Sequence, residues 1–327
     1  MMNMREDWID NLKGIGIALV VLGHMRIPEP LGKFIFSFHM PLFFFISGYL
    51  FKGEFSGWYV RGKLDHLLVP YLVYAFPLLC LALASGLPFD YCVRNLLLGN
   101  GLYTNWFLSS LFTVSIFGGA IVCCCHNWIL LLLISFSICV LGQTLPILQH
   151  PLVLSSHTWA PALVFWLVGF LFADRRLFQS LCGGAWLRRT CVIVILVLVA
   201  GLHLLNIRPS IAEVKLGNPF LFYPAGLALI ALNAIVCRWL GGRATFVRYL
   251  GRNSLLIMIW HVAIPAVMML IWTSHGIDPH TSIGWRVLYS GINLLLLVIV
   301  VVLIDRYASL LSGRVRVFTR QNCEGLA

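Results

Sequence analysis

Residues 37–49 read SFHMPLFFFISGY, an apolar run that nevertheless contains His39 and, two positions later, Pro41. An ionisable side chain is costly in hydrocarbon because its charged form loses its hydration there. Ionisable residues inside membrane-spanning helices are therefore rare and, where they occur, usually belong to a functional site. The run predicts a helix that crosses a membrane, with His39 as its candidate functional residue.

The whole chain has the composition of a membrane protein. Of its 327 residues 60% are hydrophobic and 11% are charged, whereas about a quarter of the residues in a soluble domain are charged. A membrane about 30 Å thick requires roughly 20 apolar residues per helix. The sequence therefore predicts an all-α, polytopic membrane bundle in a single domain, residues 1–327, with no soluble domain. About ten transmembrane spans are expected, near residues 13–25, 34–51, 67–85, 105–124, 128–145, 158–173, 190–206, 219–237, 251–273 and 285–305.

The lysines and arginines indicate which loops face the cytoplasm, because cytoplasmic loops are enriched in them. With the N-terminus in the cytoplasm, 17 of the 23 fall on the cytoplasmic side of the predicted helices. The other side carries the remaining six, which are Arg26, Lys33, Arg94, Arg208, Lys215 and Arg286. The sequence therefore predicts an even number of spans with both termini in the cytoplasm.

Charge and cysteine usage argue against several classes of function. The net charge of +11 is explained by cytoplasmic loops that meet anionic lipid headgroups or an anionic ligand, so nucleic acid is not an expected partner. Cys123–Cys125 precede His126, but three adjacent cysteines at a helix end cannot converge on one ion. We therefore expect neither a metal site nor disulfides. Acidic residues at positions 6, 7 and 10 argue against a cleaved targeting segment.

Lys13 and His24 bracket the first predicted span, KGIGIALVVLGH. Their spacing corresponds to about three helical turns, so both side chains project from one face, about 16 Å apart along the axis. Asp10 lies one turn before Lys13 and could pair with it. Spacing alone leaves two interpretations open. The pair is functional, or Lys13 reaches the headgroups and His24 is an interfacial residue.

His24 and His39 are expected at similar depth, because about ten residues join the first two spans and make them antiparallel neighbours. Two imidazoles at one depth can share a site, one as a base and the other orienting it or stabilising developing charge. The alternative is a buried histidine bonded to a backbone carbonyl. His261 lies ten residues beyond Gly251 on the ninth span, about 15 Å into the membrane. Its apolar neighbours predict that it faces the interior of the bundle.

Two segments resemble the N-terminal sequence of members of the acyltransferase-3 family. Its members are membrane-embedded O-acyltransferases that act on sugars. The two segments are DNLKGIGIALVVLGH (10–24) and FHMPLFFFISGYLF (38–51). Lys13 and His24 match the family's basic residue and histidine separated by ten residues, although the family more often has arginine at the first position. Lysine keeps the charge but loses the planar fork of a bidentate contact. VRGKLDHLLVPYLVY (60–74), NWFLSSLF (105–112) and GRNSLLIMIWHV (251–262) are similar to later family segments.

The resemblance implies transfer of an acyl group, usually acetyl, from cytoplasmic acyl-CoA to a hydroxyl of a cell-envelope glycan or its lipid-linked precursor. It implies His24 as general base or transient acyl acceptor, with His39 orienting it or stabilising the oxyanion. The implied binding residues are Lys13, Arg61, Lys63 and Tyr71 for acetyl-CoA, and Asp10, Trp106 and His261 for the acceptor. The expected location is the bacterial inner membrane. Arg61 and Lys63 are equally explained as cytoplasmic anchors, and Tyr71 and Trp106 as interfacial aromatic residues.

Two other classes of protein are compatible with intramembrane histidines. A glycolipid transporter or flippase would use them as a proton relay, but the two halves of the chain lack a matched pair of interrupted helices. A sensory or regulatory membrane domain is the third possibility. Binding of acyl-CoA separates the enzyme from both, since neither alternative requires it.

The predicted topology is testable with reporter fusions. Fusions after Gly53 and after Gly313 should both report a cytoplasmic location, because both positions lie on the lysine- and arginine-rich side. An extracytoplasmic signal at either position would reverse the orientation and move the donor side with it.

Overall fold

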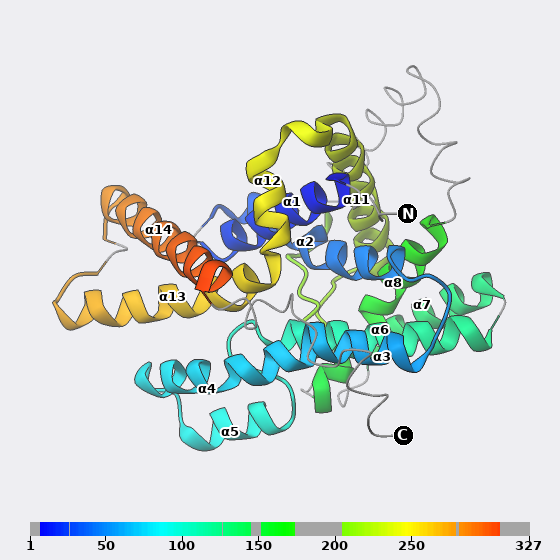
Figure 1. Ribbon diagram of the computed structural model, residues 1–327, viewed down its shortest axis with the longest axis horizontal. Coiled ribbons are helices and arrows are strands. Elements are labelled where there is room, and N and C mark those ends of the chain that lie inside the picture. Colours follow the sequence, from blue (N-terminus) through cyan, green and yellow to red (C-terminus); the bar gives the residue numbers. More distant parts are fainter. Residues whose placement is uncertain are drawn as a thin grey trace. The chain divides into compact units, whose positions relative to one another are not determined.

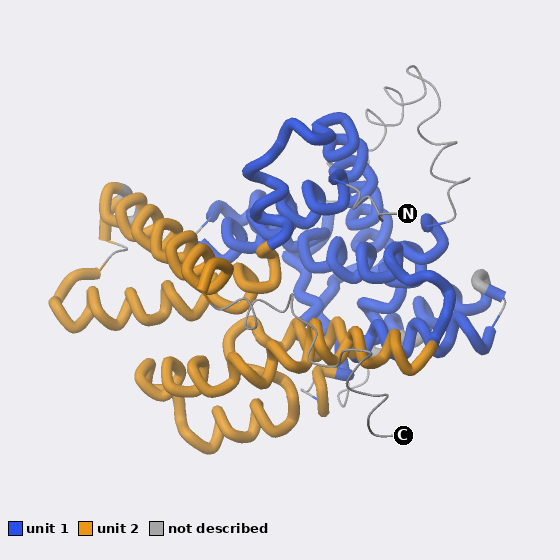
Figure 2. The backbone as a smooth tube through the Cα atoms, in the orientation of Figure 1, with its two compact units in different colours: residues 1–55, 113–152, 156–252 blue, residues 56–112, 153–155, 253–327 orange. Residues whose placement is uncertain are grey.

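The computed structural model describes residues 7–25, 27–125, 127–144, 152–173, 205–278 and 281–307. The regular elements within these residues are helices (Figure 1). The one β-bridge among the described residues, between Ser210 and Lys215, is isolated. The helices form two compact units (Figure 2). Unit 1 comprises residues 1–55, 113–152 and 156–252, and unit 2 comprises 56–112, 153–155 and 253–327. The expectation of a single domain stays a prediction.

Seven helical stretches among the described residues are long and apolar enough to cross a membrane, which confirms an all-α membrane protein. They are Glu29–Tyr49, Gly57–Ala84, Trp106–Cys124, Val153–Phe172, Pro219–Arg243, Ser254–Ser274 and Val287–Tyr307, and each coincides with a predicted span. The predicted spans 13–25 and 128–145 correspond to shorter helices of 17 residues, α1 (Asp7–Gly23) and α7 (Trp128–Thr144). The predicted span 190–206 lies almost wholly outside the described residues. The total of ten spans and the orientation stay predictions.

Helix α2 (Glu29–Tyr49) is the most enclosed part of unit 1. Every residue from Ser37 to Gly48 is buried, as expected of a helix that is apolar on all sides. Its neighbours in unit 1 are α1, α8 (Trp159–Phe172) and α11 (Pro219–Leu240). Helix α7 packs on α8.

Glycines allow α2 and α8 to cross backbone against backbone. A Cβ atom at Gly48 would overlap the carbonyl group of Trp166, and one at Gly169 would overlap that of Phe45. Small residues at such crossings are the usual means by which membrane helices approach closely. Gly16 has the same role on α1, where a side chain would collide with Leu42 of α2.

Pro41 interrupts the hydrogen bonding of α2 without breaking the helix. Proline has no N–H group, so the carbonyl of Ser37, four residues earlier, lacks its helical donor. Gly226 of α11 lies against this carbonyl, and a Cβ atom there would fall 2.8 Å from its oxygen. Neighbouring helices make such prolines tolerable within a membrane.

The first and last segments of unit 1 meet through α12 (Thr245–Arg252), which follows the short η4 turn Gly241–Arg243 and packs along α1. A Cβ atom at Gly14 would overlap the carbonyl of Val247, and one at Gly251 would overlap the carbonyl of Asp10. The two backbones are therefore in direct contact.

Unit 2 contains α3 (Gly57–Lys63), a π-helical turn (Leu64–Leu68), α4 (Val69–Ala84), α5 (Phe89–Leu97), α13 (Ser254–Ser274) and α14 (Ile283–Tyr307). Helix α6 (Trp106–Cys124) begins in unit 2 and ends in unit 1, and the η3 turn (Val153–Thr158) is likewise divided. The π turn precedes Pro70, which cannot donate to the carbonyl of His66. Instead the N–H of Val69 bonds to the carbonyl of Leu64. Within the unit, α4 packs on α5 and α13, and α13 packs on α14.

The crossing of α2 and α8 predicts the effect of one added methyl group. Gly48→Ala should lower the melting temperature of the detergent-solubilised protein by several degrees, because overpacking a tight crossing costs about 1–3 kcal/mol. Gly62→Ala is the control, since Gly62 is also helical but has open space around its Cα atom. Equal melting temperatures for the two variants would contradict the tight crossing.

Candidate functional site

The sequence-predicted site residues are divided between the two units. Unit 1 contains Asp10, Lys13, His24 and His39. Unit 2 contains Arg61, Lys63, Tyr71, Trp106 and His261. In unit 1, His24 and His39 meet near the end of α1, whereas Asp10 and Lys13 lie in its first half.

Both histidines of unit 1 bond to the backbone one helical turn earlier. Nδ1 of His24 lies 2.9 Å from the carbonyl oxygen of Val20, and Nδ1 of His39 lies 2.7 Å from that of Ile35. A carbonyl oxygen only accepts, so Nδ1 carries the proton in each ring. In the neutral form of both rings the lone pair is therefore on Nε2, the nitrogen that a general base requires.

Phe36 connects the two histidines. Its ring centroid lies 4.7 Å from that of His39, edge to face, and 5.8 Å from that of His24. Helix α2 begins at Glu29, earlier than the predicted position 34, so His39 lies ten residues into it, about 15 Å along the axis. His39 is buried, whereas His24 is exposed just beyond the end of α1. Phe36 lies about one turn nearer the start of α2 than His39 and packs on both rings, and the similar depth expected of the two histidines stays a prediction.

Arg208, which the sequence analysis counted only among the cations of the outer side, packs on the ring of Phe36. Its guanidinium carbon is 3.9 Å from the centroid of the Phe36 ring. Nη2 donates a 3.3 Å hydrogen bond to the carbonyl of Gly23, at the end of α1. The segment that follows the predicted span 190–206 thus brings a cation to the two histidines.

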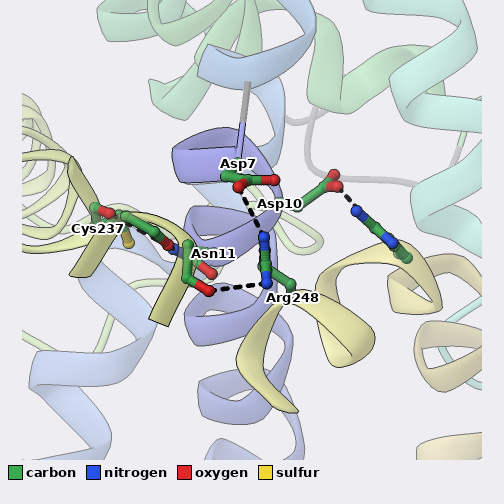
Figure 3. A network of polar contacts seen from close by, with 8 residues as sticks. Asp7, Asp10, Asn11, Cys237 and Arg248 are labelled. Carbon is green, nitrogen blue, oxygen red and sulfur yellow. Dashed lines mark hydrogen bonds and ion pairs between the residues drawn. The ribbon is translucent and has the colours of Figure 1, made fainter. Parts of the chain in front are cut away.

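The opposite end of α1 carries two ion pairs with α12 (Figure 3). Arg248 Nη1 lies 2.6 Å from Asp7 Oδ2, and Arg252 Nε lies 3.1 Å from Asp10 Oδ2. Asp10 is 1% exposed, so its carboxylate would be left buried without this partner. The pair therefore gives Asp10 a structural role, and its assignment to the acceptor stays a prediction.

Asn11 ties the end of α11 to the same region of α1. Its side-chain Nδ2 donates to the carbonyl of Gly241 at 2.8 Å and more weakly to that of Cys237 at 3.4 Å (Figure 3). The Cys237 carbonyl also accepts from the backbone N–H of Gly241, the residue that follows the last residue of the helix. Arg238 of α11 stacks on Trp8, 4.7 Å from its centroid. Lys13, half-buried, lies one turn further along α1.

In unit 2, Tyr71 and the Met258 carbonyl bond to the loop between α5 and α6, residues 98–105, whereas His261 bonds within its own helix, α13. The Tyr71 hydroxyl donates to the carbonyl of Leu96 at 3.2 Å and accepts from the N–H of Gly101 at 3.0 Å. The carbonyl of Met258 accepts from Nδ1 of His261 at 2.8 Å and from the Thr104 hydroxyl at 2.8 Å. His261 is buried, as predicted from its apolar neighbours.

Asn105, at the end of this loop, is fully buried, and both polar atoms of its amide lack a hydrogen-bond partner among the described residues. Gly101 packs directly against it, since a Cβ atom there would lie 2.8 Å from the Asn105 Cβ. Nearby, Asn100 Oδ1 accepts from the backbone and hydroxyl of Ser155, whose hydroxyl also accepts from Ser109. Unpaired buried amides are rare, because each costs about 1–3 kcal/mol.

The two basic residues of α3 pack on aromatic neighbours. Arg61 lies over the ring of Trp58 and Lys63 over that of Tyr59, each 5.4 Å from the centroid. Trp58 itself is 46% exposed. This arrangement suits interfacial anchors as well as phosphate ligands, so both interpretations of these residues stay open. Trp106 is half-buried at the start of α6, edge-on to Phe107.

Comparison with known protein families shows which family the chain belongs to. The Acyl_transf_3 family model, an acyltransferase domain, matches residues 6–305. The chain belongs to the acyltransferase-3 family. The resemblance seen in the sequence is confirmed, and the protein is a membrane acyltransferase. Comparison with curated proteins and with solved structures gives no match. Within the described part of the acyltransferase, no group of three or more histidine, cysteine, aspartate or glutamate side chains is arranged to hold a metal ion.

Sequence reasoning missed three features of the acyltransferase. Arg208 carried a signal, because it is one of few cations on the predicted outer side and follows a predicted span. Arg248 and Arg252 are four residues apart in the sequence, as are Val247 and Gly251. This spacing indicates a helix with the two arginines on one face. Asn105 carried no signal of its own, since only the surrounding packing shows that its amide is unpaired.

The unpaired amide predicts an unusual stability effect. Asn105→Leu should leave the melting temperature unchanged or raise it, because an apolar side chain removes the desolvation penalty of about 1–3 kcal/mol. Asn95→Leu is the matched control, since Asn95 donates to the carbonyl of Tyr91 and should lose stability slightly. A large drop in the melting temperature of Asn105→Leu would show that the amide has a structural partner.

Proposed function

We propose that this acyltransferase transfers an acetyl group from acetyl-CoA to a hydroxyl of a cell-envelope glycan or its lipid-linked precursor, in the bacterial inner membrane. The observation that carries the proposal is the pair of imidazoles, His24 and His39, packed on Phe36, each with Nδ1 bonded to a backbone carbonyl, so that Nε2 is the basic nitrogen of the neutral ring. Transfer to a hydroxyl needs a group that removes its proton, and histidine has an ordinary pKa near neutrality that suits this step.

His24 is the proposed general base. Its Nε2 takes the proton of the acceptor hydroxyl while the hydroxyl oxygen attacks the thioester carbonyl. A C–O bond forms, the C–S bond breaks, and the proton passes from His24 to the CoA thiolate, so that the products are an ester and free CoA. A relay through acetyl-histidine would use the same lone pair as nucleophile.

His39 is proposed to orient the acceptor. Because Nδ1 donates to Ile35, neutral His39 offers only an acceptor at Nε2. This supports an orienting hydrogen bond from a substrate hydroxyl in preference to donation to an oxyanion, which would require the protonated ring.

The phosphates of acetyl-CoA are assigned to the opposite end of α1. Lys13 lies there, about 16 Å along the axis from His24. Arg238 and Arg243, at the end of α11 and in the adjoining turn, add positive charge to the same end of unit 1. Arg61, Lys63 and Tyr71 stay predictions for the donor, and Asp10, Trp106 and His261 stay predictions for the acceptor.

The histidines provide the test. His24→Ala should lower transfer of radiolabel from acetyl-CoA to the glycan and lipid fractions of membranes by about 10²–10⁴-fold. The purified variant should still bind acetyl-CoA, because the donor phosphates are assigned to the far end of α1. His39→Ala should also be severely impaired, and the double variant little worse than the worse single variant if both act in one step.

His275→Ala is the matched control. His275 is exposed at the end of α13 and makes the same bond, from Nδ1 to the carbonyl of Ile271 at 2.8 Å. Its variant should transfer acetyl normally. Near-normal transfer per folded molecule in His24→Ala, or failure of the wild-type protein to bind acetyl-CoA, would overturn the proposed function.

A further inference from the structure

Arg208 is held in place by three contacts. Its guanidinium stacks on Phe36 at 3.9 Å, and Nη2 donates to the carbonyl of Gly23. On the third side is Gly32 of α2, where a Cβ atom would lie 3.3–3.5 Å from Nη1, Cζ and Nε. The absence of a side chain at position 32 therefore leaves room for the guanidinium. Arg208 is half-buried, so part of its fork remains accessible.

The charge of Arg208 acts on both histidines. Phe36 is the ring on which His24 and His39 pack, and Arg208 lies over that same ring. The cation is close enough to repel positive charge on either imidazole. A guanidinium stays protonated throughout the physiological range, so this repulsion is permanent.

The described residues supply no anion to offset this charge. Arg248 and Arg252 pair with Asp7 and Asp10, and Lys215, in the same segment as Arg208, pairs with Glu213 at 2.7 Å. None of the carboxylates in the described ranges forms an ion pair with Arg208. Of the five N–H groups of the guanidinium, only one is used in its hydrogen bond to Gly23.

An unneutralised cation opposes the chemistry proposed for His24. When the base takes the proton of the acceptor hydroxyl it becomes an imidazolium, which Arg208 repels. An anion that arrives with the acceptor and binds Arg208 removes this repulsion at the moment of reaction. Such an anion would accept charge-assisted hydrogen bonds, and the planar fork suits the two oxygens of a phosphate or a carboxylate.

We propose that the acceptor of this acyltransferase carries an anionic group, phosphate or carboxylate, close to the hydroxyl that is acylated, and that Arg208 binds this group. The inference rests on the proposed function, since it assigns the histidine site to the acceptor. A phosphate would come from the carrier of a lipid-linked sugar, and a carboxylate from an acidic sugar.

Three synthetic ligands with one decyl chain test the proposal. They are decyl glucoside, which is neutral, decyl glucuronide, which has a carboxylate, and glucosyl decyl phosphate, which has a phosphodiester. Binding to the purified full-length protein is measured without acetyl-CoA. Wild-type protein should bind one of the anionic ligands, or both, about tenfold or more tightly than the neutral one, as expected for charge-assisted hydrogen bonds. The anion that binds more tightly identifies the source.

Variants test whether Arg208 is the residue that causes the preference for anionic ligands. Arg208→Gln should abolish the preference for anionic ligands and leave the affinity for decyl glucoside unchanged, while Arg208→Lys should keep part of it. Lys215→Gln is the matched control, because it removes a charge from the same segment that is already paired with Glu213. It should keep the full preference.

Two results would overturn the proposal. One is equal binding of neutral and anionic ligands by the wild-type protein, and the other is an unchanged preference in folded Arg208→Gln. Both are independent of acetyl transfer. If acetyl-CoA did not bind but the anionic preference depended on Arg208, the proposed function would fail and the anion site would stand.

Discussion

The burial of α2 on every side is the constraint on which unit 1 depends. Lipid tails are as apolar as leucine, so membrane helices associate through close van der Waals contact rather than through the hydrophobic effect. Gly48 and Gly169 permit this contact by bringing the backbones of α2 and α8 together. With α2 enclosed from Ser37 to Gly48, the ring of His39 is held inside unit 1, and it packs on the half-buried ring of Phe36 beside it.

Helix α1 joins two regions of different chemistry. At its start, Asp7 and Asp10 hold α12 through arginines, and the glycine contacts bring the two backbones together. At its end, Gly23 receives Arg208 and His24 packs on Phe36. One of the carboxylates, that of Asp10, is buried, and its charge would be costly there without the arginine that pairs with it. The start of α1 is therefore the structural anchor, and the proposed chemistry is at its other end.

The fold leaves the interactions of two polar side chains incomplete among the described residues. Arg208 has charge without a carboxylate among the described residues, and Asn105 has an amide without a partner there. By contrast, the polar groups at the start of α1 are mostly paired, as Asp10 with Arg252. Stability alone favours the paired arrangement, because buried polar groups lose their hydration. Violations of this rule in otherwise well-packed proteins tend to coincide with functional sites.

The sequence by itself determined the class of protein, most of the spans and the family, because these depend on local composition and on short motifs such as Lys13 to His24. It also placed His24 and His39 on neighbouring helices, since a short connection leaves few alternatives. Only the tertiary structure decided that Arg208, more than 180 residues from His24 in the chain, lies on Phe36 beside them. The physical reason is that helix packing depends on contacts between residues distant in sequence, such as Gly48 with Trp166, whose partners no local pattern specifies.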